Sequence, residues 1–147
     1  MIDKQKYNTY QTNIRKDVIH CLKKNNIRPL NILEIGGGSG YTSAFLCKEF
    51  NCKAINIDIS LPKHRANNII HIQSDISKIP IKSSVNDKKF NLVLALDVLE
   101  HIDNTQNLIE SILHICSKDA FIVFSMPNVK NLRVPYQIYC KNTFPRK

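Results

Sequence analysis

The strongest constraint on the fold is the stretch from residue 31 to residue 40, which reads NILEIGGGSG. An apolar run of strand type ends there on all four glycines that the chain has. Glycine adopts positive φ without strain, and its missing Cβ lets a ligand lie directly on the main chain. Because residues 41–50 have the pattern of a helix, the glycines lie between a strand end and a helix N-terminus. In an α/β sheet this is the position at which nucleotides bind.

The spacing of the glycines distinguishes between kinds of nucleotide site. A dinucleotide fingerprint needs a glycine or another small residue three positions after its second glycine, but Tyr41 stands three positions after Gly38. The pattern acid-x-Gly-x-Gly-x-Gly fits instead, through Glu34, Gly36, Gly38 and Gly40. A nicotinamide enzyme is therefore disfavoured. A plain tight turn between strand and helix remains the alternative to a ligand site.

Apolar periodicity predicts strands that alternate with helices. The predicted strands span residues 31–35, 53–58, 69–73, 90–96 and 120–125. The predicted helices span residues 6–25 and 41–50, a short turn after Ser60, a longer segment after Asn104, and 134–140, with mostly loop over 76–89. The helix after Asn104 is expected to bury one stripe: Leu108, Ile109, Ile112, Leu113 and Cys116. This alternation predicts an α/β fold, a Rossmann-like, doubly wound, three-layer α/β/α sheet of five parallel strands in the order 3-2-1-4-5.

Length and charge narrow the classes of function. A chain of 147 residues is expected to form one domain, with an N-terminal helical cap over 1–29, a ligand-binding core over 30–128 and a basic tail over 129–147. The formal net charge is +9, but the two ends carry +10 and the body, residues 31–125, carries −1. Nucleic-acid binding by the core is therefore disfavoured. The basic termini are either a solvated surface or a contact with something anionic.

Cysteine usage and the first residues indicate a compartment. The five cysteines form no C-x-x-C pair, so neither a disulfide framework nor a metal site is expected. Residues 1–6 are polar and include no apolar segment of a secretory signal. A reducing cytoplasm fits both observations.

Acidic residues follow the predicted strands at one edge of the sheet. Glu34, Asp58, Asp75 and Asp97 stand at or just past the ends of the first four strands. Asp58 lies 18 residues past Gly40, where a carboxylate can accept both hydroxyls of a ribose. No lysine or arginine that could bind a phosphate occurs in residues 35–47. This edge suits a phosphate-free nucleoside that carries cationic groups.

Four segments then resemble, in order and spacing, the motifs of the class I S-adenosylmethionine-dependent methyltransferases that modify small molecules, lipids or glycans. They are ILEIGGGSG (32–40), IDIS (57–60), QSDI (73–76) and LDVLEHI (96–102). The resemblance covers residues 30–128, and residues 125–131 resemble, more weakly, members that modify glycans or lipid-linked sugars. Nucleic-acid base methyltransferases carry Asn/Asp-Pro-Pro-Tyr/Phe after strand four, whereas this chain has Asp97-Val98-Leu99-Glu100. Methylation of bases is therefore disfavoured.

The resemblance implies a role for each matching residue. Gly36, Gly38 and Gly40 would admit the methionine part of S-adenosylmethionine, and Glu34 and Asp97 would face its amino acid end. On the other side, Asp58 would hold the ribose hydroxyls, Ile59 would pack on the adenine, Asp75 would accept from the adenine amino group, and Ile76 would offer its backbone.

A base is needed only where the acceptor hydroxyl still has its proton, and His101 is the best-placed candidate. Packing and hydrogen bonding near the cofactor is the alternative role of His101. A metal cluster of Glu100, His101 and Asp103 matches no ligand template, so no metal is expected.

The resemblance also implies a sheet that continues past strand five, yet only about 20 residues follow Pro127. We therefore expect strands six and seven of the family to be absent. Three alternatives follow: the chain is a truncated form, a partner chain or a second copy covers strand five, or the protein keeps five strands. The expected function is methyl transfer, by O-methylation, to a small-molecule, lipid or glycan acceptor. The alternative is a non-catalytic module of the same fold that acts through a partner chain.

Overall fold

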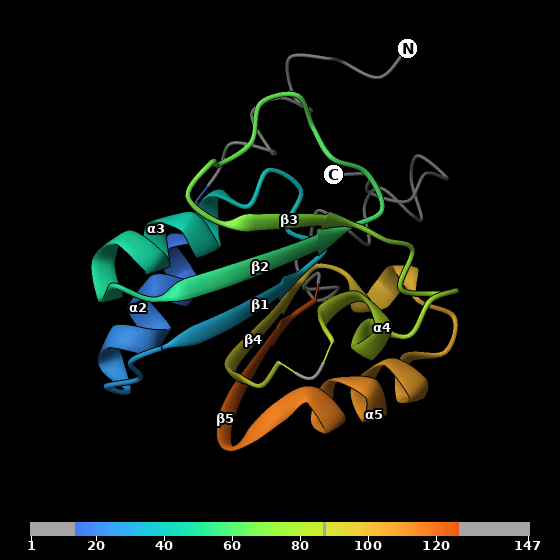
Figure 1. Cartoon of the computed structure of the whole chain (residues 1–147). Coiled ribbons are helices and arrows are strands. Elements are labelled where there is room, and N and C mark those ends of the chain that lie inside the picture. Colours follow the sequence, from blue (N-terminus) through green and yellow to red (C-terminus); the bar gives the residue numbers. More distant parts are fainter. Residues whose placement is uncertain (1–13, 87, 127–147) are drawn as a thin grey trace, which may run out of the picture.

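A computed structural model describes residues 14–86 and 88–126 of the chain (Figure 1). Its helices and strands alternate, except between residues 58 and 70, where one strand follows another without a helix. In chain order they are α2 (Lys16–Lys24), β1 (Asn31–Ile35), α3 (Tyr41–Phe50), β2 (Lys53–Asp58), β3 (Ile70–Gln73), α4 (Ile81–Val85), β4 (Phe90–Leu96), the 3-10 turn η1 (Leu99–His101), α5 (Thr105–Ile115) and β5 (Cys116–Ser125).

The five strands form one parallel sheet in the order β3-β2-β1-β4-β5, which confirms the predicted topology. β1 lies at the switch point: Ile35 pairs with Ile57 of β2 on one side and with Ala95 of β4 on the other. Parallel strands buried on both faces need continuous apolar runs, and β4 supplies one with six of its seven residues buried.

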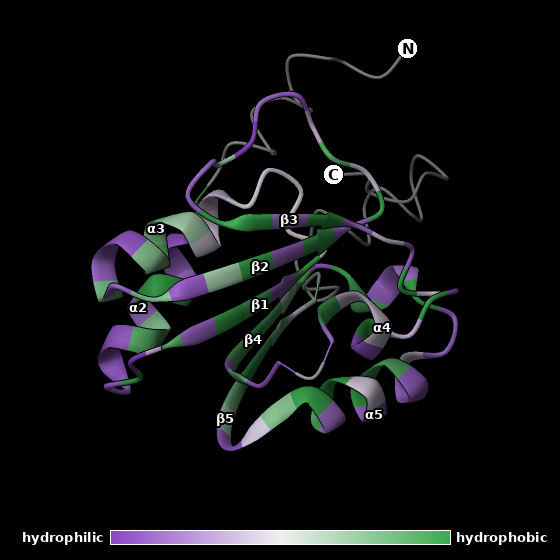
Figure 2. Ribbon diagram, viewed as in Figure 1, coloured by the Kyte–Doolittle hydropathy of each residue, from purple (hydrophilic) through white to green (hydrophobic). Residues whose placement is uncertain are grey.

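Helices cover both faces of the sheet, and this gives the three layers that the sequence predicts (Figure 1). On one face Val18 and Leu22 of α2 and Leu46 of α3 pack against Ile32 and Leu92. On the other face α4 and α5 pack against residues that include Leu33, Ile55 and Val93. Figure 2 shows the apolar positions in green along the strands and polar positions in purple on the outer sides of the helices.

The helix expected after Ser60 is wrong, because residues 59–69 contain no helix. The Ser60 N–H donates to Asp58 Oδ1 at 2.9 Å, and the Ala66 N–H donates to the Ser39 carbonyl at 2.9 Å. The Ser39 hydroxyl in turn donates to the His64 carbonyl at 2.9 Å. Backbone groups that a helix would use for its own hydrogen bonds therefore bind Asp58 and Ser39 instead.

The other predicted elements differ from the structure mainly in their bounds. The described part of the helix predicted over 6–25 is α2, and the rest of that prediction, like the helix over 134–140, lies outside the described residues. α5 begins after Asn104 as predicted, and the Asn104 side chain accepts from the Asn107 N–H at 3.1 Å. The buried stripe predicted for this helix is wrong near its C-terminal end. Ile115 is buried there, whereas Leu113 is 58% exposed.

β5 begins at Cys116, four residues before its predicted start, and is the last strand of the described sheet. Phe121 is 49% exposed and Phe124 is 37% exposed on this edge strand. Within residues 14–86 and 88–126, no helix has the length and apolar character needed to cross a membrane.

Candidate functional site

The turn from β1 to α3 is built on backbone that favours glycine. Gly36, Gly38 and Gly40 have φ of +69°, +53° and +69°. A Cβ at Gly36 would lie 2.3 Å from Val98 Cγ2, so that position has no room for a side chain. A Cβ at Gly38 would meet no atom within 4 Å. The space beside Gly38 is therefore open, and its main chain is accessible to a ligand.

Two side chains of β2 hold the peptide groups of Gly38. The Gly38 N–H donates to Asp58 Oδ2 at 2.8 Å, and the Asn56 amide nitrogen donates to the Gly38 carbonyl at 2.8 Å. Asp58 Oδ1 also accepts from Ser60, but a carboxylate has about four acceptor positions. Asp58 is half-buried and keeps acceptor capacity for hydroxyl groups of a ligand.

Glu34 lies under the turn rather than on the open edge. Its side chain is 3% exposed, and Oε2 accepts from the Ser43 N–H at 3.3 Å. A Cβ at Gly37 would lie 2.5 Å from the Glu34 carboxyl carbon and 2.6 Å from Asn56 Oδ1, so both side chains flank the same point. Burial raises the pKa of Glu34 to about 7, against the opposing hydrogen bonds of Ser43. This placement favours a supporting role for Glu34.

Sequence reasoning gave no role to Asn56 or His71, yet both support the turn. His71 Nε2 lies 2.7 Å from the Ala66 carbonyl, and His71 Nδ1 lies 3.2 Å from the Asn56 amide nitrogen. A carbonyl can only accept, so the proton belongs on Nε2 and Nδ1 accepts from Asn56. The sequence did hold a signal for Asn56: its spacing from the glycines places it on β2, beside the turn.

Asp97 begins the loop after β4 with φ +58°, a conformation that Asp tolerates better than most residues. Its N–H donates to the Ser125 carbonyl at 3.0 Å, and Oδ1 accepts from the Ser125 hydroxyl at 2.9 Å. Oδ2 forms an ion pair with Arg15 at 3.3 Å. Arg15 was not predicted as a site residue, because it lies 82 positions away in the sequence. The ion pair places a cation and a carboxylate beside the switch point.

The predicted adenine side of the site lies at the ends of β2 and β3. The Ser74 N–H donates to the Asp58 carbonyl at 2.9 Å, so the two strand ends lie side by side. Ile59 is 65% exposed, which leaves its side chain available to a flat ligand. Asp75 Oδ1 accepts from Ser77, and Oδ2 pairs with Lys78 at 3.1 Å. The hydrogen bond from Ser77 contributes most, and the pair with Lys78 adds to it. Together they lower the pKa of Asp75 and keep its carboxyl group ionised. Ile76 beside it is half-buried.

His101 ends the 3-10 turn after β4, and its side chain is exposed to solvent. Its N–H donates to the Val98 carbonyl at 2.9 Å, which fixes the backbone but not the ring. This exposure is compatible with either role, as a base for a substrate at the edge or as a residue that packs near a bound cofactor. Among residues 14–86 and 88–126, no three His, Cys, Asp or Glu side chains are grouped so that they could hold a metal.

Of the four predicted acids, the structure places Asp58, Asp75 and Asp97 at the carboxyl edge of the sheet and Glu34 beneath it. The residues present fit a phosphate-free nucleoside. The open main chain at Gly38 adjoins the Asp58 carboxylate, and the Arg15–Asp97 pair can meet an amino acid group of either charge.

Known proteins resemble this chain in sequence. Residues 7–138 match a family model described as "Methyltransferase domain". A protein of Rickettsia bellii named ubiquinone biosynthesis O-methyltransferase is 31% identical over 110 residues, which cover 71% of this chain and 45% of that protein. A protein of the same name from Rickettsia typhi is 30% identical over 113 residues, with 73% and 45% covered. The chain thus spans about half the length of these curated relatives.

Solved structures show the same fold. A SAM-dependent methyltransferase from Archaeoglobus fulgidus aligns with a TM-score of 0.69 at 22% identity, over 99% of this chain and 67% of that one. The plantazolicin methyltransferase BpumL, solved in complex with SAH, aligns with a TM-score of 0.66 at 19% identity, over 92% and 58%.

Proposed function

Because this chain belongs to the class I S-adenosylmethionine-dependent methyltransferase family, we propose that it binds S-adenosylmethionine at the glycine turn and transfers the methyl group to a hydroxyl of a small molecule. The observation that carries this proposal is the open main chain at Gly38, held at the carboxyl edge by the Asp58 carboxylate. A phosphate site would need cations near the turn. Among the described residues, Arg15 at the switch point is already paired with Asp97, and Arg65, in the loop that binds Ser39, donates to the Pro62 carbonyl at 3.1 Å.

Each residue of the edge has a task in this proposal. Asp58 accepts the ribose hydroxyls through its remaining acceptor positions, and Ile59 packs on the adenine. Asp75 accepts from the adenine amino group, beside the backbone of Ile76. These tasks follow the resemblance and are supported by the exposure of Ile59 and the ionised state of Asp75.

At the other end of the ligand, the Arg15 guanidinium binds the carboxylate of the methionine part and Asp97 binds its ammonium group. Gly36 and Gly40 keep the turn close to the sheet, while Glu34 supports the turn from below. Glu34 therefore acts on the ligand through the loop, which differs from the direct contact that the resemblance implies.

When bound, the cofactor supplies a methyl group on a sulfonium, whose positive charge is lost as the methyl leaves. The protein would hold the acceptor oxygen in line with that methyl group, and such positioning can contribute roughly 7–11 kcal/mol to catalysis. A ring nitrogen of His101 takes the hydroxyl proton where the acceptor still carries it. His101 suits this role because it is exposed at the edge, on the turn that follows β4.

For the acceptor we propose a small molecule of the quinone-precursor type, because the relatives from Rickettsia are named ubiquinone biosynthesis O-methyltransferases. Lipid and glycan acceptors are the alternatives within the same family. We also propose a reducing, cytoplasmic location, which agrees with the free thiols of Cys21, Cys47, Cys52 and Cys116.

A second candidate function is a non-catalytic module of this fold that acts through a partner chain. It is favoured by the exposed apolar residues Phe121 and Phe124 on the edge strand β5. A partner chain or a second copy would bury them and pair with the strand.

Calorimetric titration with S-adenosylmethionine and S-adenosylhomocysteine tests the proposal. We expect both to bind, and Asp58→Ala to weaken binding by about 10- to 100-fold, as for the loss of a charged hydrogen-bonding partner. Asp119→Ala, which removes an exposed carboxylate on β5, is the matched control and should bind as wild type. Failure of the wild-type chain to bind either compound would remove the proposal. Binding without turnover of a panel of hydroxyl acceptors would favour the non-catalytic module.

A further inference from the structure

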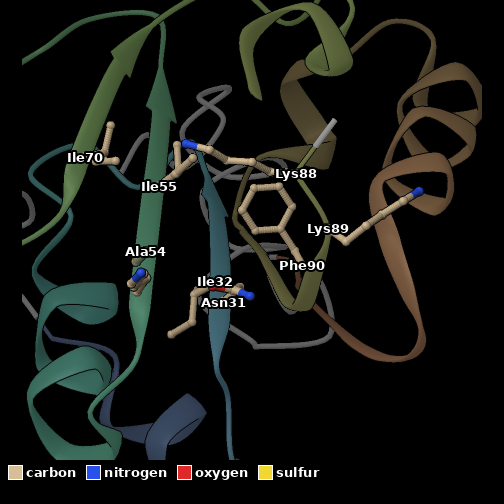
Figure 3. Close-up of a pocket in the computed structure, with 9 residues that line it drawn as sticks. Asn31, Ile32, Ala54, Ile55, Ile70, Lys88, Lys89 and Phe90 are labelled. Carbon is tan, nitrogen blue, oxygen red and sulfur yellow. The ribbon is translucent and has the colours of Figure 1, made fainter. Parts of the chain in front are cut away.

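The opposite edge of the sheet carries a cavity. It has a volume of about 400 Å³ and is lined by residues at or near the beginnings of four strands (Figure 3). The glycine turn and Asp58 lie at the carboxyl ends of β1 and β2, whereas Asn31 and Lys53 of the cavity begin these same strands. The cavity is therefore separate from the proposed cofactor site by the length of the strands.

Strand register explains the apolar floor of the cavity. Asn31 pairs with Lys53 and Ile55 pairs with Ile70, so these four residues share the face that α4 and α5 cover. α4 has only five residues and lies at the other end of that face, where Ser84 hydrogen-bonds to Ser74 after β3. The short helix leaves the amino ends uncovered, and Ile70 is 53% exposed as a result.

The rim of the cavity is cationic. Lys53, Lys88 and Lys89 line it, and none of the described residues that line it is acidic. Lys89 donates to the His114 carbonyl at 2.5 Å and points away from the cavity, whereas Lys88 reaches across it towards Ile55 (Figure 3). Within the described part of the chain, the side-chain ammonium groups of Lys53 and Lys88 form no ion pair or hydrogen bond. Two ammonium groups thus remain available above an apolar floor.

We propose that this cavity binds a small organic anion, a molecule with one acidic group and an apolar ring or short chain. The acidic group lies between Lys53 and Lys88, and the apolar part packs on Ile55, Ile70 and Phe90. The volume lies at the lower end of the range of small-molecule sites, about 300–1,000 Å³, so the ligand has no more than about three rings. An inorganic anion would leave the apolar floor in water, and a neutral apolar molecule would leave the ammonium groups without a partner. This proposal does not depend on the methyltransferase proposal, because it uses neither the glycine turn nor the carboxylates of the other edge.

The test uses 8-anilinonaphthalene-1-sulfonate, which combines an apolar ring system with one anionic group, and the full chain labelled with ¹⁵N. We expect saturable binding of one molecule, with amide shifts at Lys53, Ile55, Ile70 and Phe90 and none at Gly36–Gly40. Sodium sulfate and the neutral N-phenyl-1-naphthylamine each lack one of the two features and should bind more weakly.

Two pairs of charge reversals serve as test and control. Lys53→Glu with Lys88→Glu should weaken the binding of the anilinonaphthalene sulfonate by about tenfold or more, from two lost attractions and two added repulsions. Lys24→Glu with Lys48→Glu changes the net charge equally, on helices of the other face, and should leave binding unchanged. If the first pair unfolds the chain, Lys53→Gln with Lys88→Gln replaces it. Amide shifts at the glycine turn, no binding at all, or equal losses in both pairs would overturn the proposal.

Discussion

Replacing Glu34 by Gln should remove a pH dependence from the stability of the fold. Glu34 is 3% exposed, and burial raises its pKa from 4.5 to about 7 while the hydrogen bonds of Ser43 oppose the shift. In the unfolded chain the same group titrates near its ordinary value. Between the two values Glu34 is therefore protonated in the folded state and ionised in the unfolded state.

The size and sign of the effect follow from proton linkage. The folded state holds one proton more, so the free energy of unfolding falls as pH rises, by about 1.4 kcal/mol for each pH unit. The full contribution is present below pH 4.5, and about 3 kcal/mol of it is lost by pH 7. Asn56 Oδ1 is buried without a hydrogen-bond partner and flanks the same point as the Glu34 carboxyl, so a protonated Glu34 can donate to it. The Glu34→Gln amide can donate there too, at every pH.

Urea denaturation of the wild type and of Glu34→Gln between about pH 5 and pH 8 measures the difference. The variant should gain about 3 kcal/mol relative to wild type across this range, with no gain in Glu110→Gln, which alters an exposed carboxyl on α5. Asp17 and Asp75 have lowered pKa values, so the stability that they contribute is lost only at lower pH. Parallel curves for the wild type and Glu34→Gln would show that Glu34 is ionised in the folded protein.

Three further predictions concern packing, capping and thiol chemistry. Gly36→Ala should cost about 2–5 kcal/mol of unfolding free energy, from positive φ and the contact with Val98, and Val98→Ala in the same chain should restore part of it in urea denaturation. Asn104→Ala removes the cap of α5 and should cost about 1 kcal/mol, seen as a lower Tm; an unchanged Tm would mean that the cap contributes nothing. Burial and the neighbouring Cys52 raise the pKa of the Cys47 thiol, so iodoacetamide near neutral pH should alkylate the exposed Cys21 at least about tenfold faster, as mass spectrometry of the peptides can show. Equal rates would contradict the burial of Cys47.

The sheet was predictable from the sequence because its signals are local. Buried parallel strands are short apolar runs, such as residues 90–96, and the helix cap at Asn104 acts within one turn. The order of the strands followed from right-handed crossovers and from the glycine turn after β1.

The errors arose where distant residues compete for the backbone. Ser60 looked like a helix start, but the turn around Ser39 uses the hydrogen bonds that such a helix would need. Likewise, a carboxylate at a strand end can point along the edge, as Asp58 does, or beneath the turn, as Glu34 does. Pattern alone does not distinguish these orientations, and the partnership of Arg15 with Asp97 depends on tertiary structure alone.

Gly38 has its N–H and its carbonyl bound by Asp58 and Asn56, two residues apart on one strand. The shape of the turn thus depends on side chains of β2 as much as on the glycines themselves. An engineer who moved residues 36–40 into another α/β scaffold would need to move both polar side chains with them, since without these anchors the peptide is free to rotate. Any substitution at residue 56 or 58 in this chain acts, in effect, as a substitution in the turn.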